Sequence, residues 1–300
     1  MPYAKCGDIQ LYYEAAGKGE PIVFVHEFAD DLRSWAPQLR FFSRRYRCIA
    51  FNARGYPPSD VPQAAAKYSQ AIATDDIACL MRHLKIAKAH IIGCSMGGYA
   101  TLHFGLRYAR MACSLTVVGA GYGSDPDKRA QFLDDTEVMA RRFDALGTAE
   151  AVKPYQIGPA RVQFQNKDPH GFAHFCAEFA KHSALGSANT LRGVQARRPS
   201  IYSLERKLAQ LKVPLHVMNG DEDNNCIDPA IFIKRVCPSA WLTIVPNTGH
   251  AVNVEEPDLF NRLTAEFLAQ VDSGRWQPRD PRSLNKSTMA NVRKARKEAR

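Results

Sequence analysis

The chain has 300 residues, of which 45% are apolar and 23% are charged, and its formal net charge is +10. This composition excludes a disordered or collagen-like chain, and a chain of this length can bury a core without disulfides or a structural metal. No stretch approaches the roughly 20 apolar residues that span a bilayer, and the N-terminal residues lack an apolar signal core, so we expect neither an integral membrane protein nor a secreted one.

Short apolar runs alternate with amphipathic stretches along the chain. Apolar and β-branched runs predict strands at residues 9–14, 22–25, 48–51, 90–93, 115–119, 214–218 and 241–245. Apolar residues at helical spacing predict helices at 71–85 and 256–271, and a further helix is expected at 99–107. Strands that alternate with helices indicate an α/β fold, in which a mostly parallel sheet carries helices on both faces.

The alternation of strands and helices stops between about residues 122 and 208. That stretch contains helix candidates near 128–146 and 171–185 but no strong buried strand. An insertion after one strand of an open α/β sheet lies over the strand ends, where ligands bind. We therefore predict a core made of residues 1–121 and 209–273, with 122–208 as a helical cap.

A candidate nucleophile, Ser95, lies where a predicted strand meets a predicted helix. It is the central residue of Gly93-Cys94-Ser95-Met96-Gly97. A serine on such a sharp turn needs small neighbours, and the turn exposes its hydroxyl at a helix N-terminus, where developing negative charge is favoured. The N–H of Met96 would point at an oxyanion formed there.

A serine hydroxyl needs a base that is itself oriented by a carboxylate. His250 follows the last predicted strand, and Asp223 follows the strand before it. Both lie past the carboxyl ends of strands, at the same edge of the sheet as Ser95, and we predict a triad of these three residues. Asp221 is the second choice for the acid, and Glu222 is a weaker one.

Over residues 5–272 the sequence resembles the α/β-hydrolase family. In that family the acid commonly follows a glycine by three positions, as Asp223 follows Gly220. The resemblance also implies a second oxyanion donor in the loop after the first parallel strand, where the family usually has His-Gly. Carried over to this sequence, that donor is the N–H of Phe28, which with Met96 would form the oxyanion hole.

Glu27 stands where the family has glycine, and it adds a carboxylate near the reaction centre. A carboxylate aimed at the oxyanion would oppose catalysis, so we expect Glu27 to point aside, toward Arg54 or a loop N–H. The alternative role for Glu27 is that of a second acid or a water-orienting group.

Residues 52–60 resemble a family loop, with Asn52 in place of aspartate. Arg54 is expected to order the loops under the site.

The resemblance implies a hydrolase that transfers an acyl group to water and needs no cofactor and no metal. We expect a small-molecule substrate, an ester or lactone of small to medium size, with a carbon–carbon bond hydrolase or a non-catalytic ligand-sensing homologue as alternatives. Candidate substrate-binding residues are Trp35, Phe172 and Phe175. His170 and His174 could share a helix face as metal ligands, but no convincing partner set accompanies them.

The spacing of the eight cysteines bears on their redox state. No cysteine pair has CxxC spacing, and the wide scatter of the cysteines along the chain indicates reduced thiols in a cytoplasmic protein.

Residues 274–300 carry nine basic and two acidic side chains, which leaves a net charge of +3 for the rest of the chain. We expect a basic, disordered tail, with an acidic-membrane or nucleic-acid anchor as the alternative. Nucleic-acid binding by the nearly neutral body is not indicated.

Overall fold

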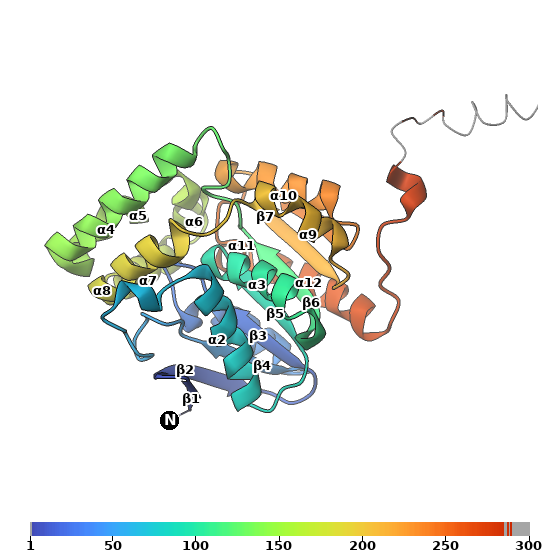
Figure 1. Ribbon diagram of the computed structural model, residues 1–300, viewed down its shortest axis with the longest axis horizontal. Helices are drawn as coiled ribbons and strands as arrows, with labels where there is room; N and C mark the ends of the chain where they lie inside the picture. Colours follow the sequence, from blue (N-terminus) through green and yellow to red (C-terminus); the bar gives the residue numbers. More distant parts are fainter. Residues whose placement is uncertain (1, 285–286, 288, 290–300) are drawn as a thin grey trace, which may run out of the picture.

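The structure is a computed structural model that describes residues 2–284, 287 and 289, and a sheet of eight strands forms its centre (Figure 1). The strand order is β1-β2-β4-β3-β5-β6-β7-β8. The pairs β1/β2 and β2/β4 are antiparallel, and the others are parallel. The strands are β1 Tyr3–Cys6, β2 Ile9–Ala16, β3 Pro21–Val25, β4 Arg47–Phe51, β5 Ala89–Cys94, β6 Ala112–Val118, β7 Leu215–Gly220 and β8 Ala240–Val245. The predicted mostly parallel sheet is confirmed.

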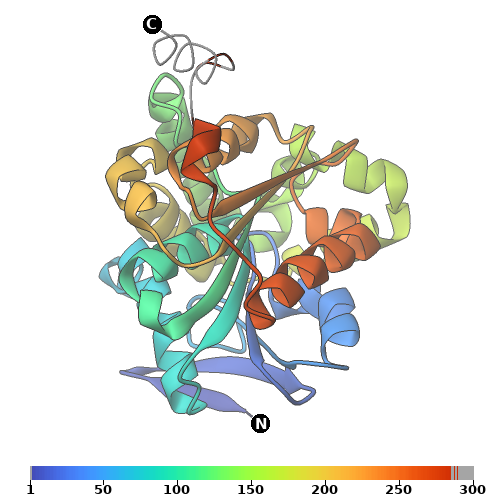
Figure 2. The ribbon, with the colours of Figure 1, turned by 90° about the vertical axis from the view of Figure 1, so that its right-hand side faces the viewer.

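Helices cover both faces of the sheet, as predicted. In Figure 2 the teal helices α2 and α3 lie on one side of the sheet, and α1 (blue) and α12 (red-orange) lie on the other. The α-helices are α1 Ala36–Phe42, α2 Gln70–His83, α3 Met96–Arg107, α4 Arg129–Ala151, α5 Lys153–Gln156, α6 Val162–Lys167, α7 Pro169–Phe179, α8 Ala184–Thr190, α9 Glu205–Gln210, α10 Asn224–Val236, α11 Val252–Glu255 and α12 Pro257–Asp272. Short 3-10 helices include Leu32–Trp35, Pro159–Arg161 and Pro281–Leu284, and a π-helix spans Leu191–Gln195.

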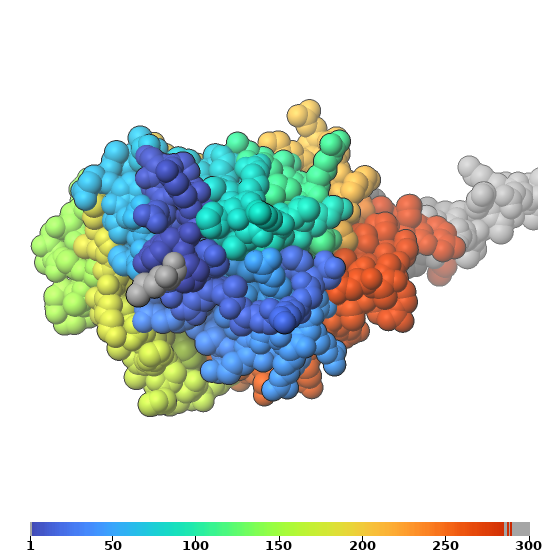
Figure 3. All heavy atoms as spheres, turned by 90° about the horizontal axis from the view of Figure 1, so that it is seen from below, coloured from blue at the N-terminus to red at the C-terminus, as the bar shows by residue number. Residues whose placement is uncertain are grey.

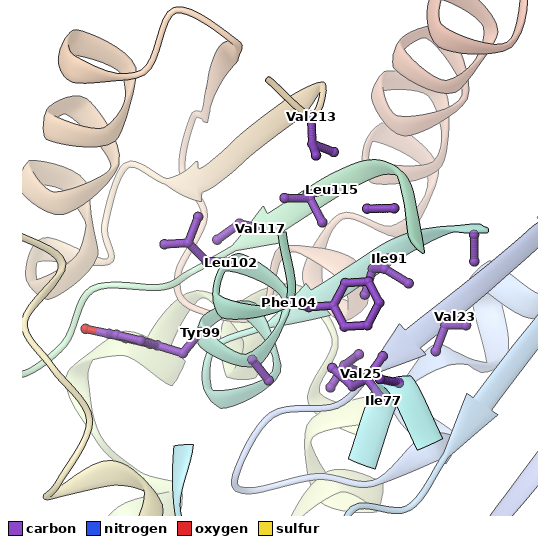
Figure 4. Packing of buried hydrophobic residues seen from close by; sticks show 14 of the residues in the cluster. Val23, Val25, Ile77, Ile91, Tyr99, Leu102, Phe104, Leu115, Val117 and Val213 are labelled. Carbon is purple, nitrogen blue, oxygen red and sulfur yellow. The ribbon is translucent and has the colours of Figure 1, made fainter. Parts of the chain in front are cut away.

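The alternation of side chains along β3 divides the core into two layers. Val23 and Val25 belong to the cluster under α2 and α3, whereas Ile22 and Phe24 belong to the cluster under α1 and α12. Figure 4 shows the first layer, in which Val23 and Val25 lie close to Ile77 of α2. Burial on both faces explains why these strands are continuous apolar runs.

The segment between β6 and β7 is helical and contains α4 to α9. Gly147, with φ of 70°, interrupts α4 and ends the part that matches the predicted helix at 128–146. The predicted helix at 171–185 begins two residues earlier in the structure, at Pro169, where Asp168 caps α7. It ends at Phe179, and a separate helix capped by Ser183, α8, begins at Ala184. In Figure 3 the green to yellow part of this segment forms one end of the molecule, whereas α9 packs against α10.

The segment 274–284, which we expected to belong to a disordered tail, contacts the body of the protein. Trp276 packs against the core layer under α1 and α12, and the N–H of Arg279 donates to the carbonyl of Pro238 at 2.8 Å. Most of the predicted tail, from residue 285 onward apart from 287 and 289, lies outside the described residues. Within the described part, no helix is long and apolar enough to cross a membrane.

Two of the eight cysteines are bonded to each other. A disulfide joins Cys6 of β1 to Cys79 of α2, with 5.7 Å between the Cα atoms. The prediction of reduced thiols is therefore wrong for this pair. It rested on sequence spacing, and the two residues are 73 positions apart, so only the fold brings the edge strand beside the helix. The other six cysteines are free.

Candidate active site

Ser95 lies at the sharp turn between β5 and α3. Its backbone has φ of 54° and ψ of −113°, an unusual conformation for a residue with a side chain, and α3 begins at the next residue, Met96. A Cβ atom on Gly97 would lie 2.1 Å from the carbonyl oxygen of Val25, which explains why this turn requires glycine. The first N–H groups of α3 have no partner within the helix and are available to a ligand.

His250 and Asp223 meet at the carboxyl ends of β8 and β7. Nδ1 of His250 lies 2.6 Å from Oδ2 of Asp223, and both side chains are buried. Burial alone would lower the pKa of His250, but the Asp223 carboxylate outweighs it, and the pKa is raised above 6.5. Burial alone would raise the pKa of Asp223, and the same pairing holds it below its usual value. Asp223 therefore stays ionised beside the imidazole.

The opposite side of the imidazole faces a carboxylate. Nε2 of His250 lies 4.0 Å from Oε2 of Glu27, and no hydrogen bond to Ser95 is recorded for His250 among the described residues. Catalytic hydrogen bonds are often long before a substrate binds, so this geometry is compatible with a role for Ser95. It shows that His250 lies between two carboxylates.

His26 fixes the loop that carries Phe28. Its Nε2 accepts a hydrogen bond from the N–H of Ala53 at 2.9 Å, which leaves Nδ1 to donate to the carbonyl of Glu27 at 2.6 Å. Burial lowers the pKa of His26, in keeping with this neutral form. The Tyr56 hydroxyl donates to the carbonyl of Phe28 at 2.9 Å. The loop is thus tied on both sides of the predicted oxyanion donor.

Glu27 does not pair with Arg54, contrary to our expectation. Arg54 binds Asp76 of α2 with two hydrogen bonds of 2.9 and 3.1 Å, whereas Glu27 accepts a hydrogen bond of 2.5 Å from Nη2 of Arg161. Both members of the Glu27–Arg161 pair are 3% exposed. Burial works to raise the pKa of Glu27, but the guanidinium outweighs it and holds the pKa below the usual value.

Arg161 comes from the segment between β6 and β7. The preceding residue, Ala160, accepts a hydrogen bond of 3.0 Å from the N–H of His250, so the 3-10 helix Pro159–Arg161 lies directly against this histidine. The guanidinium stacks 4.9 Å above the Phe175 ring. Its Nη1 is buried and has no hydrogen-bond partner within the described residues.

Sequence reasoning missed Arg161 because no motif marks it. The one available signal is indirect. Glu27 is expected in a buried loop, and a buried carboxylate needs a cation as its partner. That requirement does not say which of the many arginines between β6 and β7 provides it. The fold settles the choice by bringing together residues that are 134 positions apart.

The three candidate substrate-binding residues lie in two different places. Trp35 is fully buried beneath the sheet, with its ring 5.1 Å from that of Phe24, so we leave it out of the site proposed below. Phe172 and Phe175 belong to the apolar cluster that also contains Phe28 and Met96. Their position is consistent with an apolar wall above the predicted oxyanion hole.

One set of possible metal ligands occurs in the described part of the chain, formed by Asp223, Cys226 and His250 within 4.8 Å of one another. The Cys226 thiol donates to the carbonyl of Gly119 at 3.3 Å, and burial raises its pKa well above the usual value. Metal binding would require this thiol to lose its proton and Asp223 to leave the imidazole. His170 and His174 are both exposed on α7.

Comparison with known proteins gives one family. A sequence profile described as alpha/beta hydrolase fold matches residues 20–257. A protein of Bacillus subtilis, provisionally named as a 2-succinyl-6-hydroxy-2,4-cyclohexadiene-1-carboxylate synthase, is 25% identical over 262 residues, which are 86% of this chain and 93% of that protein. The 3-oxoadipate enol-lactonase 1 of Acinetobacter baylyi is 24% identical, over 83% of this chain and 89% of its own length.

Solved structures give the same fold. The enol-lactonase from Burkholderia xenovorans superposes with a TM-score of 0.76 at 23% identity, and the match covers 89% of this chain and all of that one. At this identity the likeness concerns the fold, and the chemistry has to be argued from the site itself.

Proposed function

Because the chain belongs to the alpha/beta hydrolase fold family, we propose that it is a serine hydrolase that cleaves an ester or lactone of small to medium size. The observation that carries the proposal is the 2.6 Å contact between His250 and Asp223, at the same sheet edge as the strained Ser95. A carboxylate-held imidazole at the same sheet edge as a half-buried serine on a sharp turn supplies the groups that acyl transfer requires.

In the first step Ser95 Oγ attacks the carbonyl carbon and gives its proton to Nε2 of His250. Asp223 accepts the Nδ1 hydrogen bond and stabilises the imidazolium. The N–H groups of Phe28 and Met96 bind the oxyanion, and the positive end of α3 adds to their effect. His250 then protonates the leaving alcohol, and an acyl ester of Ser95 remains.

In the second step water replaces the alcohol. The water oxygen bonds to the acyl carbon as His250 takes one of its protons, and the ester bond to Ser95 breaks as the proton passes to Oγ. Phe172 and Phe175, which face the same cluster as Phe28, would contact the apolar part of the substrate. Distant relatives named as enol-lactonases favour an ester or lactone over other acyl substrates.

The proposal is tested with a fluorophosphonate probe and a substrate panel. We expect a covalent adduct on Ser95 in the folded protein and turnover of short p-nitrophenyl esters or small lactones. Ser95→Ala should lose both the adduct and at least about 10³-fold in kcat. Full esterase activity in Ser95→Ala would refute the assignment. Turnover of diketones without ester turnover would instead favour the carbon–carbon bond hydrolase.

A further inference from the structure

Glu27 is a buried carboxylate that the triad mechanism leaves without a role. Its Oε2 accepts a hydrogen bond from Arg161 and lies 4.0 Å from Nε2 of His250. Asp223 binds the other ring nitrogen, Nδ1, so the two carboxylates lie on opposite sides of the imidazole. Glu27 therefore faces the nitrogen that exchanges protons during the reaction.

The attacking water in the second step has one O–H for which the triad offers no acceptor. The water gives one proton to Nε2, and an acceptor for its second O–H would fix the direction in which its lone pair points. Two hydrogen bonds of about 2.8 Å that diverge from one oxygen at roughly the tetrahedral angle span about 4.5 Å. The separation of Glu27 Oε2 from Nε2 is close to that span.

We propose that Glu27 orients the attacking water during hydrolysis of the acyl-enzyme, and that Arg161 of the cap positions its carboxylate. The inference rests on the proposed serine-hydrolase function. The water oxygen forms the bond to the acyl carbon, one proton moves to His250, and the second O–H donates to Glu27. When the tetrahedral intermediate collapses, the bond to Ser95 Oγ breaks and Oγ takes the proton from His250, so Glu27 stays unprotonated throughout.

The charges around the site allow this role. Glu27 alone would repel the oxyanion, but the positive charge of Arg161 at 2.5 Å offsets it. The lowered pKa of Glu27 keeps it an acceptor at neutral pH. Further titratable groups near His250 are Cys226, whose thiol stays protonated beside Asp223, and Cys94, whose thiol donates to the His250 carbonyl at 4.0 Å. Glu255 accepts a hydrogen bond from the N–H of Gly249.

The test separates the two chemical steps with p-nitrophenyl acetate. In Glu27→Gln, stopped-flow release of nitrophenolate should show a burst equal to the enzyme concentration, followed by a steady state that is at least about 10-fold slower than in the unmodified enzyme. The acylation rate should change by less than about threefold. Mass spectrometry of the quenched reaction should find the acetyl group on Ser95.

Methanol as an alternative acyl acceptor gives a second readout. Methanol has one O–H, which it donates to His250, so it does not need Glu27. The ratio of methanolysis to hydrolysis should therefore rise in Glu27→Gln by about the factor by which hydrolysis falls, and Glu27→Asp should restore part of the preference for water.

The matched control is Glu256→Gln, which removes another ion pair between cap and core, the 2.6 Å contact with Lys167. Both steps should keep their rates in that variant. If Glu27→Gln folds poorly, Glu27→Gln/Arg161→Gln removes both charges and should show the same rise in the methanol ratio. Equal slowing of acylation, hydrolysis and methanolysis would overturn the role of Glu27. Absence of any Ser95-dependent release would overturn the proposed function and this inference with it.

Discussion

At the scale of single residues, the places of the three proposed triad residues follow from local sequence, whereas the environment of the histidine does not. Ser95, Asp223 and His250 each follow a strand that the apolar pattern identifies, and parallel strands bring their carboxyl ends to one edge. Glu27 is visible in the sequence as an unusual residue. Its partner Arg161 lies in a segment without a strand pattern, so only the tertiary structure pairs them.

The raised pKa of His250 predicts the acidic limb of the pH profile. A protonated imidazole cannot accept the Ser95 proton, so kcat/KM should fall as pH drops through a pKa above 6.5. Asp223→Asn removes the carboxylate that raises this pKa most, so burial, which lowers it, is then opposed only by the weaker effect of Glu27. The limb should move to lower pH, and the plateau should fall by about 10³–10⁴-fold. A pH series of kcat/KM measures both the position of the acidic limb and the height of the plateau. An acidic limb at the same pH in Asp223→Asn would contradict the role of Asp223 in raising the pKa of His250.

At the scale of helices and strands, the buried central strands were the most predictable elements. Their runs of β-branched and aromatic residues are long enough to be distinguished from helix patterns. The edge strand β1 has only four residues and carries no such run, and the sequence did not reveal it. The same limit applies to the disulfide, because the contact of β1 with α2 depends on how the sheet edge twists.

The disulfide is expected to stabilise the folded protein, and its reduction should have the same effect as removal of one of its cysteines. Cys6 and Cys79 close a loop of 73 residues, for which chain entropy gives about 4 kcal/mol of stabilisation. Cys79→Ser should lower the free energy of unfolding in urea by up to that amount and remove its dependence on dithiothreitol. Cys113→Ser, at a free and half-buried cysteine, is the control. Eight reactive thiols in the denatured, unreduced protein, instead of six, would disprove the bond.

At the scale of the whole molecule, composition located the excess charge correctly but did not show where the body of the protein ends. The basic composition begins at residue 274, and we drew the boundary of the core there. In the structure Trp276 still packs on the core, and Arg279 is bonded to the loop before β8. A single aromatic residue within a polar segment is too weak a signal to move a boundary predicted from composition.

Two truncations test this boundary. Removal of residues 285–300 should leave both Tm and activity unchanged. Removal of 274–300 also deletes Trp276 and the Arg279 hydrogen bond, and it should cost about 1–2 kcal/mol, or a few degrees in Tm, with esterase activity retained at 25 °C. Differential scanning calorimetry compares the two proteins, and equal Tm values would place the end of the folded body before residue 274.

The Glu27–Arg161 pair also constrains how this protein can change by recombination. A chimaera that keeps Glu27 but takes the segment between β6 and β7 from a relative without an arginine at the place of Arg161 would leave a carboxylate unpaired in the interior, at a cost of about 3–5 kcal/mol. A chimaera that replaces both residues together avoids this cost. Any exchange of this segment therefore has to treat Glu27 and Arg161 as one unit, although they are 134 positions apart.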